Sequence, residues 1–99
     1  MSRPKNWWYP IALRVTKNYN KLFEKSSPAI SIWLYALNKA IKDTEDSDNG
    51  QDKMKAVTLV YFSKEYTIAG IAQKMGYSEV TVKRWLSSFV NLVGKYAGY

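Results

Sequence analysis

Apolar residues recur at intervals of three and four along most of the chain, which is the spacing of a helix that buries one face. The first such segment follows Pro10, a residue suited to the first turn of a helix. Its apolar positions are Ile11, Val15, Tyr19 and Leu22. Its basic residues, on another face, are Arg14, Lys17 and Lys21. The pattern predicts a first helix over about residues 10–25, whose basic face suits either solvent or a nucleic-acid backbone.

A second helical segment begins at Ser27 and Pro28, a pair in which the serine caps the helix and the proline takes its first position. Its apolar stripe comprises Ile30, Trp33, Leu34, Leu37 and Ile41, widened by Ile32 and Tyr35. Because the stripe is broad, we expect this helix at the centre of the core. It is predicted to end near Lys42.

Residues 43–52 hold five of the eight acidic residues, together with Ser47, Asn49 and Gly50. Small polar residues and clustered charges between periodic segments predict a solvated loop. The alternative is that this acidic loop forms a contact surface for a partner.

Helical spacing returns over residues 51–64, with Met54, Val57, Val60 and Tyr61 on the apolar side. No segment predicts a strand. The chain is therefore predicted to be all-α, with about five helices in one domain over residues 1–99. An N-terminal helical pair and the acidic loop would occupy residues 1–50. Residues 51–99 would form the C-terminal part, in which the last helix, over about residues 78–96, is predicted to be the longest.

The composition narrows the classes of function. With 46% apolar and 15% aromatic residues, a chain of 99 residues can bury a core of its own. It contains no Cys and no His, which excludes disulfides and argues against zinc, thiol and imidazole chemistry. The carboxylates cluster in a loop instead of pairing in buried positions. We therefore expect no enzyme activity, no cofactor and no metal.

The sequence predicts neither a membrane-spanning helix nor a secretion signal. No apolar stretch approaches the ~20 residues that span a bilayer. Residues 1–10 carry charges and paired tryptophans where a secretion signal would need an apolar run. We expect a cytoplasmic protein that makes no membrane contact. Its formal charge of +7, from fifteen Lys and Arg against eight Asp and Glu, favours an acidic partner such as nucleic acid.

The most informative segment is residues 67–87, TIAGIAQKMGYSEVTVKRWLS. Thr67 is placed to cap a short helix that ends at Met75, and Gly76 follows where a tight turn needs a positive φ. Ser78 is placed to cap the next helix, with Glu79 in the first turn, where the helix dipole favours a negative charge. Two short helices joined by a glycine turn predict a helix-turn-helix.

The apolar spacing sorts this segment into two faces. The inward positions are Ile68, Ile71, Ala72, Met75, Val82, Trp85, Leu86 and Phe89, with Tyr77 leaving the turn. The outward positions of the second helix are Ser78, Glu79, Thr81, Lys83, Arg84 and Ser87. Alternatively, the protein does not bind DNA through this segment. The two helices then serve only to complete the core, and Lys83 and Arg84 face solvent.

An outward face of this kind suits the major groove of DNA, where base edges present distinct donors and acceptors. Arg84 or Lys83 would recognise guanine through O6 and N7. Thr81 would contact a thymine methyl group, and Glu79 would accept from a cytosine amino group. Contacts to phosphates, which fix the register of the protein on the duplex, are predicted for Thr67, Lys74 and Tyr77. Affinity should fall steeply with salt.

Residues 66–85, YTIAGIAQKMGYSEVTVKRW, resemble the helix-turn-helix of phage late-gene transcription regulators of the RinA and ArpU type. Together with the preceding helix, the segment of about residues 53–93 is also similar to region 4 of sigma factors, the part that recognises the −35 promoter element and touches core polymerase. The resemblance implies a supporting helix over residues 67–75 and a recognition helix over about residues 78–88. It implies activation of late phage genes in a bacterial host. Residues 1–50 lie outside the resemblance, and Val82 stands where an aromatic or polar residue is expected.

Two other functions remain open at this stage. A small DNA-packaging subunit of a phage terminase also uses a helix-turn-helix, although usually at the N-terminus. A protein-interaction adaptor would contact RNA polymerase through Trp7, Trp8 or the acidic loop. A DNA-binding protein with a single helix-turn-helix commonly acts as a homodimer. Leu92, Val93 and Tyr96 are candidates for that dimer interface or, equally, for the core.

Overall fold

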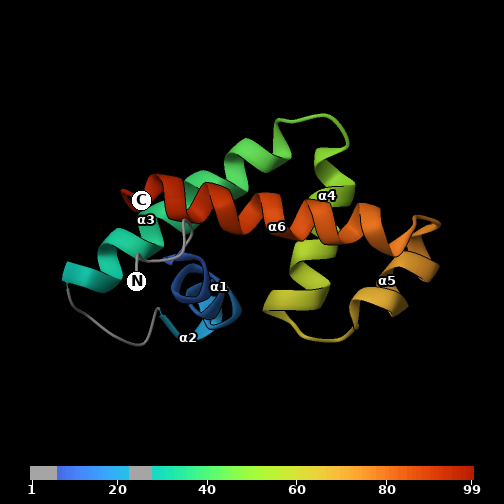
Figure 1. Ribbon diagram of the computed structural model, residues 1–99, viewed down its shortest axis with the longest axis horizontal. Coiled ribbons are helices and arrows are strands. Elements are labelled where there is room, and N and C mark those ends of the chain that lie inside the picture. Colours follow the sequence, from blue (N-terminus) through green and yellow to red (C-terminus); the bar gives the residue numbers. More distant parts are fainter. Residues whose placement is uncertain (1–6, 23–27) are drawn as a thin grey trace, which may run out of the picture.

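The structure, a computed structural model, describes residues 7–22 and 28–99, and all regular secondary structure in these two ranges is helical (Figure 1). The elements in chain order are α1 (Tyr9–Lys17), α2 (Tyr19–Leu22), α3 (Pro28–Glu45), α4 (Gly50–Val57), the π-helical turn η1 (Thr58–Phe62), α5 (Ile68–Met75) and α6 (Glu79–Tyr96). The prediction of an all-α fold is confirmed, with five helices of eight residues or more in the described part of the chain.

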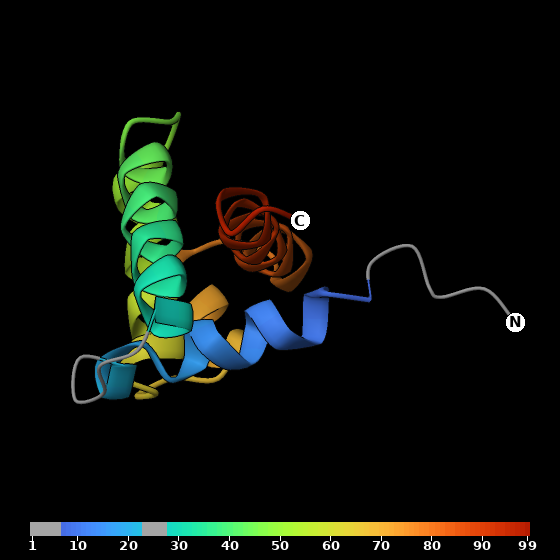
Figure 2. The same cartoon turned by 90° about the vertical axis from the view of Figure 1, so that its left-hand side faces the viewer.

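Helix α6 is the element around which the others pack. It crosses the width of the molecule in Figure 1 and contacts α1, α3, α4 and α5. Figure 2 looks along α6 and shows α3 on one side of it and α1 beneath it. The prediction that the last helix is the longest is only half right, because α3 and α6 both span 18 residues.

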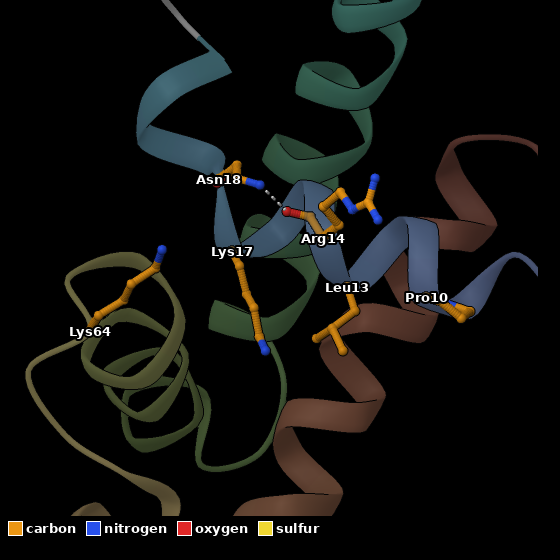
Figure 3. A pocket seen from close by; sticks show the side chains of 6 residues that line it. All are labelled: Pro10, Leu13, Arg14, Lys17, Asn18 and Lys64. Carbon is orange, nitrogen blue, oxygen red and sulfur yellow. Dashed lines mark hydrogen bonds between the residues drawn. The ribbon is translucent and has the colours of Figure 1, made fainter.

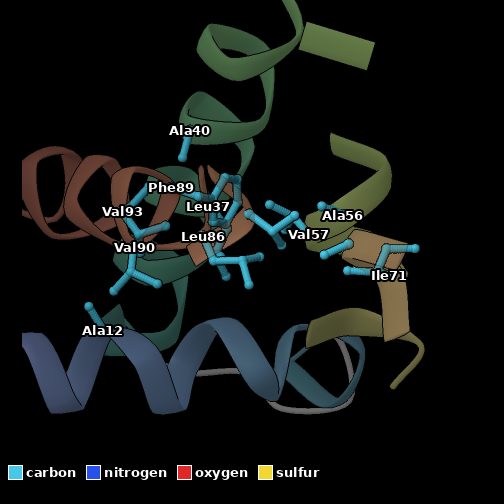
Figure 4. Close-up of a cluster of buried hydrophobic side chains, with 13 residues drawn as sticks. Ala12, Leu37, Ala40, Ala56, Val57, Ile71, Leu86, Phe89, Val90 and Val93 are labelled. Atoms are coloured by element: carbon cyan, nitrogen blue, oxygen red, sulfur yellow. The ribbon is translucent and has the colours of Figure 1, made fainter. Parts of the chain in front are cut away.

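The core follows one face of α6 (Figure 4). Its fully buried apolar residues in α6 are Val82, Leu86, Phe89, Val90 and Val93. Leu37 of α3, Val57 of α4 and Ile71 of α5 fill the spaces between these side chains and the surrounding helices. Small residues of α1 and α3, namely Ala12, Ala36 and Ala40, are also fully buried, which lets these helices approach α6 closely.

The C-terminal end of α6 is covered by aromatic rings from elsewhere in the chain. A Cβ atom on Gly94 would overlap the ring of Trp8, so only glycine fits beneath that ring. The Trp8 ring stacks on Tyr99, with ring centroids 6.3 Å apart. Tyr99 also stacks on Trp33 of α3, at 6.0 Å. Trp8 is therefore held against α6 and is connected to α3 through Tyr99.

The prediction of one continuous first helix over residues 10–25 is wrong. Helix α1 ends at Lys17, and the short α2 follows after Asn18. The Asn18 side-chain amide donates to the carbonyl oxygen of Arg14 at 2.9 Å, a local hydrogen bond that competes with continuation of the helix. The buried face of α1 is centred on Ala12 and Thr16, whereas Ile11 is exposed.

Helix α3 starts at Pro28, as predicted, while its predicted cap, Ser27, and the predicted end of the first helix at residue 25 lie outside the described residues. The prediction that Ile32 and Tyr35 widen its buried stripe is wrong, because they are 53% and 57% exposed. The narrower stripe is completed by the alanines of the core.

Helix α3 continues three residues past its predicted end near Lys42, to Glu45. Asp43 accepts a hydrogen bond from the hydroxyl of Tyr96 in α6, and Thr44 is buried. These tertiary contacts hold the last turn of α3 in place. Because α4 then begins at Gly50, the predicted acidic loop over residues 43–52 shrinks to residues 46–49.

The predicted helix over residues 51–64 is present but irregular. Its second part, η1, is a π turn in which the Ser63 N–H donates to the carbonyl oxygen of Thr58 at 2.8 Å. Lys64 ends the turn in the left-handed region, with φ 56°. The N–H groups of Glu65 and Tyr66 both donate to the carbonyl oxygen of Leu59, at 3.0 and 3.1 Å, and close the helix end.

Candidate nucleic-acid interface

The candidate interface consists of α5, the connection over residues 76–78 and the first half of α6. Thr67 lies before α5 with an extended backbone, and its hydroxyl oxygen accepts from the Gly70 N–H at 3.0 Å. This is the predicted N-cap, which satisfies one of the unpaired donors of the first turn.

Gly76 makes the turn after α5 with φ 79°, as predicted. The Gly76 N–H donates to the Gln73 carbonyl oxygen at 3.3 Å, and the Tyr77 N–H donates to that of Ala72 at 3.0 Å. This pair of bonds is a Schellman motif, in which a left-handed residue closes the helix end. The turn therefore has a defined direction and aims α6 across the molecule.

Ser78 starts α6 as its N-cap, which is also as predicted. Its hydroxyl oxygen accepts from the Thr81 N–H at 3.1 Å, and the hydroxyl group donates to that of Thr81 at 2.9 Å. Glu79 stands in the first turn, where its negative charge is favourable. Thr81 is half-exposed, and its hydroxyl is engaged at the cap.

The inward face of this segment is confirmed, with one refinement. Val82, Leu86 and Ile71 are fully buried. Trp85, also predicted to point inward, is half-buried and meets the Tyr77 ring edge-on, with centroids 4.6 Å apart. Rings in this geometry attract one another beyond their buried area. The turn and the first half of α6 are thus held by packing on the protein side.

The outward face is exposed at most of its predicted positions. Ser78, Glu79, Lys83, Arg84 and Ser87 all have exposed side chains. Val80 lies among them and is 58% exposed, a position that sequence analysis did not single out. Its apolar side chain offers contact to a thymine methyl group or to a partner protein. Ser87 marks one limit of this face, because the Tyr9 hydroxyl of α1 donates to its Oγ at 3.4 Å.

The three residues predicted to contact phosphates are placed differently from one another. Thr67 is exposed and its hydroxyl serves as the cap of α5. Lys74 is exposed, and its ammonium group donates to the Tyr66 hydroxyl at 2.8 Å while lying 5.1 Å from the centre of that ring. This hydrogen bond raises the pKa of Lys74, so its positive charge persists well above neutral pH.

Tyr77 points its hydroxyl towards the protein. The hydroxyl donates to Oδ2 of Asp52 in α4 at 2.6 Å. This bond, followed by burial, raises the pKa of Tyr77. The side chain therefore connects the turn to α4. No periodicity in the sequence could have paired two residues so far apart along the chain.

The residues weighed as a dimer interface belong largely to the core. Val93 is fully buried, and the Tyr96 hydroxyl is bonded to Asp43 of α3. Leu92 is half-buried and packs against the core cluster. Of the two roles that the sequence left open for this group, the structure favours completion of the core.

Residues 7–22 and 28–99 contain no group of three or more acidic side chains arranged to hold a metal ion. No helix in this part of the chain is both long and apolar enough to cross a membrane. Comparison of the chain with protein-family models, with curated proteins and with solved structures found no match.

Proposed function

We propose that this protein binds double-stranded DNA and regulates transcription, with α5 and α6 acting as a helix-turn-helix and the first half of α6 entering the major groove. The observation that carries the proposal is the contrast across one helix. Lys83 and Arg84 are exposed, while the opposite side of the same turns is held in the core by Val82 and Leu86. A rigid helix that presents basic side chains outward is suited to the major groove.

The roles within this face follow from side-chain chemistry. Arg84 is the best candidate for direct recognition, because a guanidinium group can bind O6 and N7 of guanine together. Lys83 on the neighbouring position adds a second cation that suits guanine or a phosphate. Thr67 and Lys74 of α5 are exposed and would contact the phosphate backbone. The net charge of +7 supports attraction to DNA at a distance.

The biological setting rests on the resemblance to RinA and ArpU type regulators and to sigma region 4. On the basis of this resemblance, we expect the protein to act in the cytoplasm of a bacterial host. There it would control late phage genes and contact RNA polymerase. The adaptor alternative receives less support from the packing. Trp8, one of its two proposed anchor residues, is covered by Gly94 and Tyr99 and would not be free to enter a partner's pocket.

The test is a binding measurement on duplexes enriched from a random pool by the protein itself. We expect salt-sensitive binding, and we expect Arg84→Ala to weaken binding to the enriched duplex by about 1–3 kcal/mol while affecting a scrambled duplex much less. Lys42→Ala, which removes one exposed charge from α3, is the matched control and should preserve the preference for the enriched duplex.

Two results would contradict the proposal. The first is the absence of any salt-sensitive shift on duplex DNA, which is what an adaptor would give. The second is an enriched duplex whose affinity is the same for the wild-type protein, Arg84→Ala and Lys83→Ala, since DNA recognition would then lie elsewhere. A thermal unfolding curve for each variant shows that a lost affinity does not come from a lost fold.

A further inference from the structure

A second basic site lies beside the candidate interface, in an open groove of about 330 Å³ between α1 and the end of η1 (Figure 3). The groove is lined by Pro10, Leu13, Arg14, Lys17, Asn18 and Lys64. Three of these six residues are cations and none is acidic. A concave surface with cations and no opposing carboxylate attracts anions.

Two of the three cations come from opposite walls of the groove. In Figure 3, Lys17 extends from α1 towards the side of η1, and Lys64 stands at the other edge, whereas the Arg14 side chain is turned away along α1. The Lys17 ammonium group lies 5.8 Å from the centre of the Tyr61 ring, which holds it beside η1. Both lysines are exposed and are therefore open to a ligand from solvent.

The backbone fixes the position of Lys64. Its φ of 56° is a conformation that glycine or asparagine adopts at lower cost. The N–H groups of Glu65 and Tyr66, which directly follow Lys64, donate to the Leu59 carbonyl oxygen and fix the chain on the C-terminal side of this turn. A lysine at the end of a helix also interacts favourably with the helix dipole. The side chain thus starts from a defined point at the edge of the groove, unlike a lysine in a loose loop.

Both walls of the groove adjoin the candidate interface. Lys64 precedes the Thr67 cap of α5 by three positions in the chain, and the Tyr9 hydroxyl at the start of α1 contacts Ser87 of α6. Figure 1 shows α1 and α5 on the same side of α6, with η1 between them. A duplex that met the outward face of α6 would therefore pass its backbone close to the groove.

We infer that this groove binds a phosphate group of the DNA backbone through Lys17 and Lys64, adding a second point of contact to the one made by α6. The inference rests on the proposed function. Lysine ammonium groups act as compact point charges, which suits phosphate contact without sequence preference. Each phosphate neutralised releases counterions and adds about 0.9 to the slope of log affinity against log salt.

The test compares two double variants that remove the same charge. Lys17→Gln with Lys64→Asn removes the lysine from each wall of the groove, and asparagine tolerates the left-handed backbone at residue 64. Lys39→Gln with Lys42→Gln is the control on α3, outside the groove. Because one phosphate contact is lost, we expect the groove variant to lower the salt slope by about 0.9, equally on enriched and scrambled duplexes, and to leave the ratio of the two affinities unchanged. The control should keep the wild-type slope to within half a unit.

Three outcomes would overturn the inference, and they differ in what they say about the proposed function. A groove variant whose slope equals that of the control removes the groove from the DNA contact, while an effect of Arg84→Ala would still support recognition by α6. A wild-type protein with no salt-sensitive binding to any duplex removes both. NMR shifts at Lys17 and Lys64 upon titration with inorganic phosphate, without any change of slope on DNA, would identify a site for a small anion instead. Retention of the preference for the enriched duplex shows that the groove variant is folded.

Discussion

The two halves of α6 belong to one continuous helix but have different surroundings. In the first half one side is buried and the other presents Lys83, Arg84 and Ser87 to solvent. In the second half α1 and α3 close in, and even Gly94 is covered by an aromatic ring. Because the helix is continuous, the second half holds the first in a fixed direction. A basic face on a helix anchored in this way is positioned more precisely than one on a loop.

This difference predicts that substitutions in the two halves act on different quantities. Changes in the anchored half should lower the free energy of unfolding and affect binding only through the folded fraction. Changes on the exposed face should affect binding and leave the free energy of unfolding within about 0.5 kcal/mol of the wild type. Variants whose free energy of unfolding and DNA affinity change together would contradict this distinction between the two halves.

The largest effect is expected for Phe89→Ala. Phe89 is fully buried where the two halves meet, and its ring lies edge-on to Phe62 of η1, with centroids 6.1 Å apart. Removing the ring leaves a cavity, which should lower the free energy of unfolding by about 3–5 kcal/mol. Chemical denaturation followed by circular dichroism measures this change. A loss below about 1 kcal/mol would mean that the core does not depend on this residue.

A smaller loss, of about 1–3 kcal/mol, is expected for Gly94→Ala, because the new methyl group would overlap the Trp8 ring. A double-mutant cycle with Trp8→Ala sharpens the test. In the Trp8→Ala background the ring is absent, so Gly94→Ala should cost much less and the gain in helix propensity should become visible. If the cost is the same in both backgrounds, the ring does not cover Gly94 as described.

The smallest effect is expected for Tyr77→Phe, a change in the connection before α6 that alters the free energy of unfolding only at alkaline pH. The hydrogen bond to Asp52 raises the folded-state pKa of Tyr77 above its unfolded value. The resulting stabilisation is complete below about pH 10 and is lost as pH rises through the folded pKa, because the unfolded chain gives up its proton first. Tyr77→Phe should therefore flatten the fall in unfolding free energy above about pH 10.

Other tyrosines leave a residual dependence in that variant. The pKa of Tyr96 is raised chiefly by its hydrogen bond to Asp43, and the pKa of Tyr61 is raised chiefly by burial. Comparing Tyr77→Phe with Tyr96→Phe over the same pH range separates the two ends of α6. An alkaline fall in stability that is as steep in Tyr77→Phe as in the wild type would show that the bond to Asp52 does not contribute.

The sequence was most informative where local chemistry decides the structure. The caps at Thr67 and Ser78 and the positive φ of Gly76 were predicted correctly, because each depends on residues within a few positions of it. The exposure of Lys83 and Arg84 was also predicted, since helical periodicity assigns them to the face opposite the apolar residues.

The sequence was least informative where contacts between residues far apart in the chain determine the structure. The last turn of α3 survives in an acidic segment because Asp43 accepts from Tyr96. The hydrogen bond from the Tyr77 hydroxyl to Asp52 of α4 was not predicted. The position of Lys64 was missed because the apolar spacing runs smoothly through residues 58–62 and gives no sign of a π turn. None of these features has a local signature.

The π turn η1 also determines where the chain can tolerate a change of length. A π turn closes its hydrogen-bonded ring with one residue more than an α turn. If one residue were deleted between 58 and 62, the segment could close as an ordinary α turn, and the chain beyond it would leave in nearly the same direction. The same deletion inside α6 would rotate every later side chain by about 100° and move the apolar stripe out of the core. Deletions of one residue among homologous chains should therefore appear at η1 before they appear in the long helices.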